Sequence, residues 1–220
     1  MRVLSVVGAR PQFVKAALLS AEFQRRGIEE ILVHTGQHYD RGMSDVFFEQ
    51  LSIPDPRHHL GVGSGSHGAQ TGEMLRRLET VVEHERPDWL LVFGDTNSTL
   101  AGALVGAKLH VPVAHVEAGL RSFNKSMPEE INRIVADHVG DLLLVPNAQA
   151  AKQLASEGIT DGVEVVGDLM VDLATQVAAG LPAAPEILSR LNVHRKAYTV
   201  ATIHRASNTD DAATFARLIA

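Results

Sequence analysis

The sequence has 220 residues, of which 45% are hydrophobic, 21% are charged and only 5% are aromatic. These values are typical of a globular chain with an aliphatic core, and the length suits one large domain or one domain and part of another. Its 20 basic and 26 acidic side chains give a net charge of −6, which argues against a nucleic-acid-binding protein. The absence of cysteine excludes disulfides, thiol nucleophiles and thiolate zinc sites.

The sequence contains no run of about 18 apolar residues, the length that a membrane-spanning helix needs. Its first apolar stretch, Val3–Val7, is too short for a signal peptide and lacks a cleavage site of small residues. We therefore expect a cytoplasmic protein with no membrane or nucleic-acid partner, which acts on a small molecule.

Short aliphatic runs alternate with longer amphipathic stretches along the chain. The runs, which we expect to form strands, are Val3–Val7, Ile31–His34, Trp89–Phe93, Val111–Val116, Leu142–Val145, Val163–Val166 and Tyr198–Ile203. The predicted helices are Pro11–Arg26, Met43–Leu51, Gln70–His84, Thr96–Leu109, Pro128–Val139, Asn147–Ser156 and Leu169–Ala179. Continuous apolar runs are typical of strands buried on both faces of a parallel sheet. The alternation predicts an α/β fold with a doubly wound parallel sheet.

Two segments depart from this alternation. Residues 53–68 are rich in Pro, Gly and His, and we expect a long loop there. Residues 181–185 break the helical pattern, and the helix–strand–helix pattern after them is too small to fold alone. We therefore expect a domain over 1–180, a linker over 181–195 and the truncated start of a second domain over 196–220.

Ligands of doubly wound folds bind beyond the carboxyl ends of the strands, so polar residues at these positions are candidate site residues. After the first predicted strand, Pro11 fits the first position of a helix, and Arg10 and Lys15 lie in or beside its first turns. A helix start with two cations is typical of an anion site. The alternative is an ordinary helix start with two solvated cations.

Carboxylates follow two further strands. Asp95 follows the third predicted strand, where it or Thr96 could instead cap the next helix. Glu117 ends the fourth apolar run, and a carboxylate there needs a partner or a function because burying a charge is costly. We expect Arg10, Lys15, Asp95 and Glu117 to line one crevice at the carboxyl edge of the sheet.

A third acidic group opens the helix predicted after residue 127. Glu129 lies in its first turn, where acidic side chains are favourable, and Ser126 three residues before it matches a capping box. Two other motifs fail. The run 63–68 matches GxGxxG without a preceding strand, and 115–117 matches the H-x-E of zinc deaminases without their cysteines. No metal site is predicted.

Together these motifs resemble the non-hydrolysing UDP-N-acetylglucosamine 2-epimerases, in order and over nearly the whole chain. The matching segments are Gly8–Pro11 with Lys15, Thr35–His38, Gly94–Thr96, His115–Arg121, Pro128–Arg133 and Thr202–Arg205. The resemblance implies two Rossmann-like domains in the GT-B architecture of two-domain glycosyltransferases. It implies that this chain is the first domain and the start of the second.

The resemblance also implies an activity: reversible interconversion of UDP-N-acetylglucosamine and UDP-N-acetylmannosamine, which supplies a precursor of surface polysaccharides. The family's reaction eliminates UDP to give 2-acetamidoglucal and then adds UDP back, with the C2 proton delivered to the other face. It uses no metal or other cofactor. The partner is then a UDP-sugar substrate, the full-length form is expected to be a homodimer, and the 220-residue chain alone is expected to be inactive.

By the same resemblance, six side chains have roles in the site. The catalytic residues are Asp95, Glu117, Glu129 and the UDP-releasing His204, and the diphosphate-binding residues are Arg10 and Lys15. Arg121, Asn132 and Arg133 belong to matching motifs and are expected to position the others.

The sequence departs from the family pattern at a few positions. Gln12 stands where many members have Glu, and 122–124 with 38–40 resemble a subgroup that includes epimerases of a diacetamido-uronic acid UDP-sugar. An epimerase of such a modified UDP-sugar is therefore one alternative. A GT-B glycosyltransferase, which would move the sugar to an acceptor, is the other.

Overall fold

The structure, a computed structural model, describes residues 1–37, 53–180, 186–203 and 206–219. Three predicted features lie outside these ranges, namely the helix Met43–Leu51, residues 181–185 of the linker and His204. The chain divides into two compact units, Met1–Gln176 and Val177–Ala220. Within the described ranges, no helix has both the length and the apolar character needed to cross a membrane.

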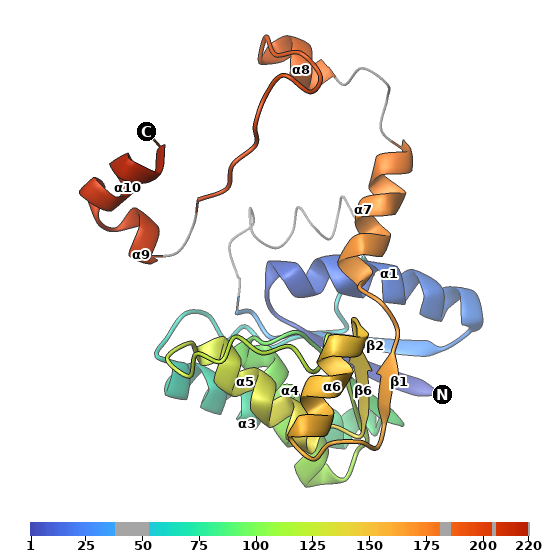
Figure 1. Cartoon of the computed structure of the whole chain (residues 1–220). Helices are drawn as coiled ribbons and strands as arrows, with labels where there is room; N and C mark the ends of the chain where they lie inside the picture. Colours follow the sequence, from blue (N-terminus) through green and yellow to red (C-terminus); the bar gives the residue numbers. More distant parts are fainter. Residues whose placement is uncertain (38–52, 181–185, 204–205, 220) are drawn as a thin grey trace. The chain divides into compact units, whose positions relative to one another are not determined.

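The first unit is built on a seven-stranded parallel sheet in the order β3-β2-β1-β4-β5-β6-β7 (Figure 1). Its strands are β1 (Arg2–Val7), β2 (Glu29–His34), β3 (His58–His59), β4 (Trp89–Phe93), β5 (Val113–Val116), β6 (Leu142–Val145) and β7 (Val163–Val165). The direction of strand addition reverses between β1 and β4, which is the topological switch point where ligands bind in such sheets. The predicted doubly wound α/β fold is confirmed.

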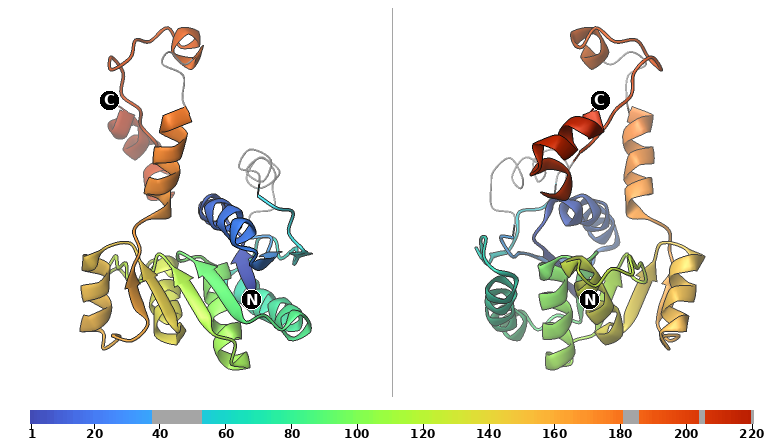
Figure 2. Two further views of the ribbon diagram at one scale, coloured as in Figure 1. Left: turned by 90° about the vertical axis from the view of Figure 1, so that its right-hand side faces the viewer. Right: turned by 60° about the vertical axis from the view of Figure 1, so that its left-hand side comes forward.

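Helices cover both faces of this sheet (Figure 2). They are α1 (Arg10–Arg26), α3 (His67–Glu85), α4 (Asn97–Leu109), α5 (Pro128–Val139) and α6 (Ala148–Ser156). The helix after β7, α7 (Leu169–Gly180), has no buried residue. The apolar side chains of β1 show why both faces are covered. Leu4 and Val6 pack in the cluster that includes α3 and α4, whereas Val3 and Val7 pack with Phe13 of α1. Apolar residues on successive positions of a strand therefore require a layer of helix on each side.

The expected long loop at 53–68 is wrong in part, because it contains the edge strand β3. His58 and His59 pair with Val33 and His34 of β2, so this short segment joins the sheet along one side. Leu60 is buried in the core cluster on the α3 and α4 side. The short histidine pair lacked the apolar pattern from which a strand is predicted.

The second unit holds α8 (Glu186–Arg190), α9 (Ala206–Thr209) and α10 (Ala212–Ile219), and α7 enters it. The prediction of a strand at Tyr198–Ile203 is wrong, since these residues have no regular structure. The described part of the unit contains no other strand with which such a run could pair. The second helix of the predicted helix–strand–helix pattern is present as α10, and the Asp211 carboxylate before it accepts the backbone N–H of Thr214 at 2.7 Å.

Candidate active site

The turn from β1 into α1 is packed too tightly for a side chain at position 8. A Cβ on Gly8 would overlap the hydroxyl oxygens of Thr35 and Ser98, which form a hydrogen bond of 2.8 Å with each other. Gln12 then accepts the backbone N–H of Gly8 at 2.8 Å and donates to the carbonyl oxygen of Phe93 at 2.9 Å. The start of α1 is thus fastened to the end of β4, a role of Gln12 that the sequence did not reveal.

Lys15, about one turn into α1, is buried rather than solvated. It forms an ion pair with Glu117, and Asp95, Asp168 and Arg133 lie near enough to act on its charge. Burial lowers the pKa of the Lys15 amine below its ordinary value of 10.5, while Asp95 and Asp168 oppose this effect and Arg133 adds to it. The alternative of a solvated cation is therefore wrong for Lys15.

Glu117 extends from the end of β5 in a left-handed backbone conformation, with φ of 69°. Its backbone N–H donates to the carbonyl oxygen of Leu144 at 3.0 Å, and Ala118 N–H donates to the same oxygen at 3.2 Å. Non-glycine residues in this region of backbone space are strained, and such strain concentrates at functional sites. The turn aims the Glu117 carboxylate at Lys15, so this strand-end acid does have a buried cationic partner.

Asp95 follows β4 and pairs with Arg133 of α5. Its backbone carbonyl oxygen accepts a hydrogen bond from the Asn132 side chain at 2.9 Å. Thr96, not Asp95, caps α4, because the Thr96 hydroxyl accepts the backbone N–H of Thr99. The Asp95 carboxylate is therefore not a helix cap, and the expectation that Asn132 and Arg133 have positioning contacts is supported by the geometry.

Glu129 is exposed in the first turn of α5. The predicted capping box is wrong, because α5 begins at Pro128 with Met127 at the capping position, and the Ser126 hydroxyl donates instead to Asn124 at 2.7 Å. The neighbouring Glu130 is buried and accepts the backbone N–H groups of residues 122 and 123 at 2.8 and 2.9 Å. Of these two acids, Glu130 therefore holds a loop and Glu129 faces solvent.

Three of the predicted site residues are brought together by the structure, namely Lys15, Asp95 and Glu117. Arg10 is exposed at the first position of α1, which begins at the same edge of the sheet. Asp168, which follows β7, was missed by the sequence reasoning although it is also a polar residue after a predicted strand. It lines a small cavity together with Lys15, Glu117, Val116, Pro146, Gly167 and Leu169.

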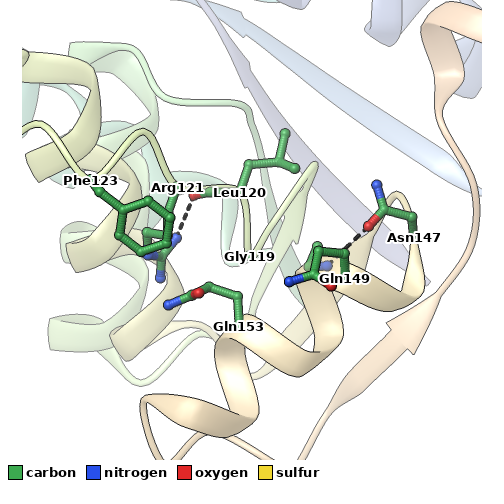
Figure 3. A pocket seen from close by; sticks show the side chains of 8 residues that line it. Gly119, Leu120, Arg121, Phe123, Asn147, Gln149 and Gln153 are labelled. Carbon is green, nitrogen blue, oxygen red and sulfur yellow. Dashed lines mark hydrogen bonds between the residues drawn. The ribbon is translucent and has the colours of Figure 1, made fainter.

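A second, open cavity of about 180 Å³ lies between the loop after β5 and α6 (Figure 3). Phe123 and Arg121 line it on the loop side, and Gln149 and Gln153 line it on the helix side. The Arg121 guanidinium donates to the carbonyl oxygen of Leu120 at 2.7 Å and is tied into ion pairs beneath the cavity. These ion pairs connect the cavity wall to the backbone of the site.

Fold and site together define a Rossmann-like α/β domain in which ionised side chains meet at the carboxyl edge beside the switch point. The comparisons with known proteins then specify the family. The family model described as UDP-N-acetylglucosamine 2-epimerase matches residues 21–220, and the chain belongs to this family.

Two curated relatives show how much of such a protein the chain represents. It is 52% identical to the UDP-N-acetylglucosamine 2-epimerase homolog of Methanococcus maripaludis. It is 49% identical to the UDP-2,3-diacetamido-2,3-dideoxy-D-glucuronate 2-epimerase of Pseudomonas aeruginosa. Each match covers 96% of this chain and 59% of the relative, so the chain spans about three fifths of the relatives' length.

Solved structures agree with this family. The Methanocaldococcus jannaschii UDP-GlcNAc 2-epimerase in complex with UDP-GlcNAc and UDP has a TM-score of 0.87 and 39% sequence identity, over 100% of this chain and 61% of that one. The lipopolysaccharide outer core galactosyltransferase WaaB has a TM-score of 0.55 at 11% identity. The second likeness shows a shared fold alone, which is the predicted GT-B relationship.

Proposed function

We propose that this chain supplies the sugar-facing half of an enzyme that inverts C2 of a UDP-N-acetylhexosamine. The single observation that carries the proposal is the convergence of Asp95 and Glu117 beside one buried amine, that of Lys15. Each carboxylate also has its own cationic partner, which holds it in one position. Two positioned acids are what the removal and return of a proton at one carbon require.

The chemistry explains why two acids are needed. The C2 hydrogen of the sugar is not next to a carbonyl group, so its direct removal is too difficult. If the C1–O bond to UDP breaks while a carboxylate accepts the C2 proton, a C1–C2 double bond forms and the product is 2-acetamidoglucal. Addition of UDP with a proton delivered to the opposite face of C2 then gives the epimer. Asp95 and Glu117 are proposed as these two groups, and Glu129 as a third carboxylate of the site.

The departing diphosphate needs positive charge. Lys15 and Arg10 are proposed to supply it, because cations placed where charge develops stabilise a transition state. His204 is proposed to assist the departure of UDP. The buried Lys15 amine would exchange part of its contact with Glu117 for the diphosphate, and Glu117 would thereby be released for proton transfer.

Two UDP-sugars are candidate substrates. The relative with 52% sequence identity is named for UDP-N-acetylglucosamine, and the relative with 49% identity is named for a UDP-diacetamido-glucuronate. The M. jannaschii structure that matches this chain holds UDP-GlcNAc, which favours the simpler sugar. Sugar transfer to an acceptor is favoured by no observation beyond the shared fold.

The test is proton NMR in deuterated water, with the protein at the full length of its relatives and this chain assayed beside it. Each UDP-sugar is incubated separately. Two observations would support the proposal. One is the appearance of the C2 epimer with deuterium at C2, and the other is the detection of free 2-acetamidoglucal. Conversion of neither sugar, or transfer to an added acceptor without C2 exchange, would contradict it.

The division into domains at 181–195 and the homodimeric state also stay proposals. Sedimentation equilibrium of the full-length protein tests the second one, since a monomer at micromolar concentration would contradict it. Limited proteolysis between 181 and 195 tests the first.

A further inference from the structure

The buried side chain of Gln12 has all of its hydrogen-bonding capacity filled. It is 1% exposed, and its Oε1 atom accepts the backbone N–H groups of Gly8 and Ala9 at 2.8 and 3.0 Å. Its Nε2 atom donates to the carbonyl oxygen of Phe93 at 2.9 Å and to the hydroxyl oxygen of Thr99 at 3.1 Å. A side-chain amide has two donor hydrogens and two acceptor lone pairs, so none of the four is left over.

The partners determine which end of this side chain is oxygen and which is nitrogen. At one end two backbone N–H groups can only donate, and at the other end the Phe93 carbonyl can only accept. The Thr99 hydroxyl donates its single hydrogen to the Phe93 carbonyl at 2.6 Å and accepts the backbone N–H of Thr96 at 3.2 Å, so only a lone pair is left for position 12. A carboxylate there would turn an oxygen toward two acceptors. These surroundings therefore favour an amide, at a position where many members of the family have Glu.

The amide joins elements on both sides of the topological switch point. Gln12 is the third residue of α1, and Thr99 is the third residue of α4. These helices follow β1 and β4, the two strands between which the direction of strand addition reverses. One buried side chain thus fastens the first turns of two helices to each other and to the end of β4.

Three of the proposed site residues lie close to these attachment points. The amide binds the backbone N–H of the residue before Arg10 and the carbonyl oxygen of the residue two positions before Asp95. Lys15 follows Gln12 by three positions on α1, about one turn further along the helix. Gln12 itself is too deeply buried to touch a substrate, so it can act on the reaction only by placing these groups.

We propose that Gln12 is a positioning residue, required as an amide, which holds the start of α1, with Arg10 and Lys15, at a fixed distance from the turn that carries Asp95. Its effect on catalysis rests on the proposed function. The requirement for an amide does not, so the two parts are measured separately.

The first measurement is urea unfolding of the Gln12→Glu variant of this chain at a series of pH values. Because an ionised carboxylate finds no donor at the Phe93 end, burial should raise the pKa of the introduced carboxyl by about 2 or more above its ordinary value of about 4.3. The folded chain then holds this proton more tightly than the unfolded chain does. The loss of stability is therefore smallest below about pH 4 and grows as the pH rises through the raised pKa. Relative to the wild type, the folding equilibrium constant should fall about 100-fold between about pH 4 and about pH 8.

Gln24→Glu is the matched control, because it makes the same substitution at an exposed position of α1. Its stability relative to the wild type should change little over this pH range. A Gln12→Glu deficit that is as independent of pH as that of the control would overturn the requirement for an amide, whether or not the protein is an epimerase.

The effect on catalysis is measured in the full-length enzyme with Gln12→Met, which keeps most of the side-chain volume and removes all four hydrogen bonds. This variant should lower kcat per folded molecule about 100-fold, the loss that follows a displacement of about 1 Å in the reacting groups. Leu78→Ala is the control, since it leaves a cavity in the core and destabilises the fold without changing either turn. Its folded molecules should keep the wild-type kcat.

Gln12→Glu gives a second readout in the same enzyme. Its kcat relative to that of the wild type should be higher at about pH 5 than at about pH 8, because the protonated carboxyl restores one donor. This comparison decides if Gln12→Met does not fold. A wild-type kcat in Gln12→Met, an equal loss of kcat in Leu78→Ala, or a relative kcat of Gln12→Glu that does not change with pH would overturn the positioning role. A wild type without C2 exchange would overturn the proposed function instead.

Discussion

Lys15 of α1 and Glu117 at the end of β5 form an ion pair across 102 positions of the chain. Their parent elements are not sequence neighbours, and the sheet places β4 between β1 and β5. Lys15 is 7% exposed and Glu117 25% exposed at the side chain, so solvent weakens their attraction far less than it does on the surface. The pair is therefore both a tertiary link and the electrostatic centre of the site.

Replacing Lys15 should destabilise the first unit by leaving Glu117 without its cation. We expect Lys15→Met to lower the free energy of unfolding by about 2 kcal/mol. The double variant with Glu117→Gln should recover part of this loss, with a coupling of about 1–3 kcal/mol. Urea unfolding of the four proteins in the cycle measures it.

The control is the exposed pair Glu22–Arg25 within α1, joined at 2.7 Å. Surface pairs of this kind contribute about 0.2–1 kcal/mol, so the same cycle there should give a much smaller coupling. Equal coupling in the two cycles would show that the Lys15–Glu117 pair is not held in a low-dielectric environment.

The strands of the sheet could be predicted because burial determines both their structure and their apolar sequence pattern. Runs such as Val3–Val7 and Trp89–Phe93 are buried on both faces of the sheet, and this burial requires the very pattern from which they were predicted. The strand predicted at Tyr198–Ile203 has the same pattern but finds no described strand with which to pair. Pairing is a property of the whole chain, which a local pattern cannot contain.

The sequence predicted at which edge of the sheet the site lies, but it did not predict which side chains contact one another there. Strand ends identified Lys15, Asp95 and Glu117, because parallel strands end at one edge. The partners of these residues could not be assigned, since Arg133 and Asp168 come from elements whose packing the sequence does not state. Asp168 was nevertheless within reach of the same rule, because it also follows a strand.

Position 8 should tolerate no side chain. Gly8→Ala forces a methyl group against the Thr35 and Ser98 hydroxyls, and overpacking of this kind costs about 1–3 kcal/mol. Gly72→Ala is the matched control, because a Cβ there meets nothing within 4 Å inside α3. It should instead stabilise the protein by about 0.5–1 kcal/mol. Thermal unfolding that showed equal effects of the two substitutions would contradict the packing described for the first turn.

A buried acid at the opposite edge of the sheet should make stability depend on acidic pH. Glu85 accepts a hydrogen bond from His58 at 2.6 Å and pairs with Arg2 at 2.9 Å and Arg57 at 3.2 Å. The hydrogen bond from His58, the charge of Arg57 and the hydrogen bond from Arg2 together outweigh burial and lower the pKa of Glu85 below its ordinary value of 4.5. Because the unfolded chain takes up this proton first, the stabilisation is complete above pH 4.5 and disappears as the pH falls through the lowered pKa.

Glu85→Gln should therefore lose about 3 kcal/mol near neutral pH, and its deficit relative to the wild type should shrink below pH 4.5. Urea unfolding at a series of pH values measures both effects. Glu83→Gln, an exposed position in the same helix, should change stability little at any pH. A Glu85→Gln deficit that stays constant through the acidic range would rule out this linkage.

The most direct test of the account is the rate at which solvent deuterium enters C2 of UDP-N-acetylglucosamine in the full-length enzyme carrying Asp95→Asn or Glu117→Gln. Both variants keep the shape of the side chain, and the remaining acids near Lys15 still balance its charge. Loss of a positioned acid or base should slow exchange by about 100-fold or more, while Glu79→Gln on the exposed face of α3 should exchange at the wild-type rate. Exchange at the wild-type rate in either active-site variant would remove that carboxylate from the reaction.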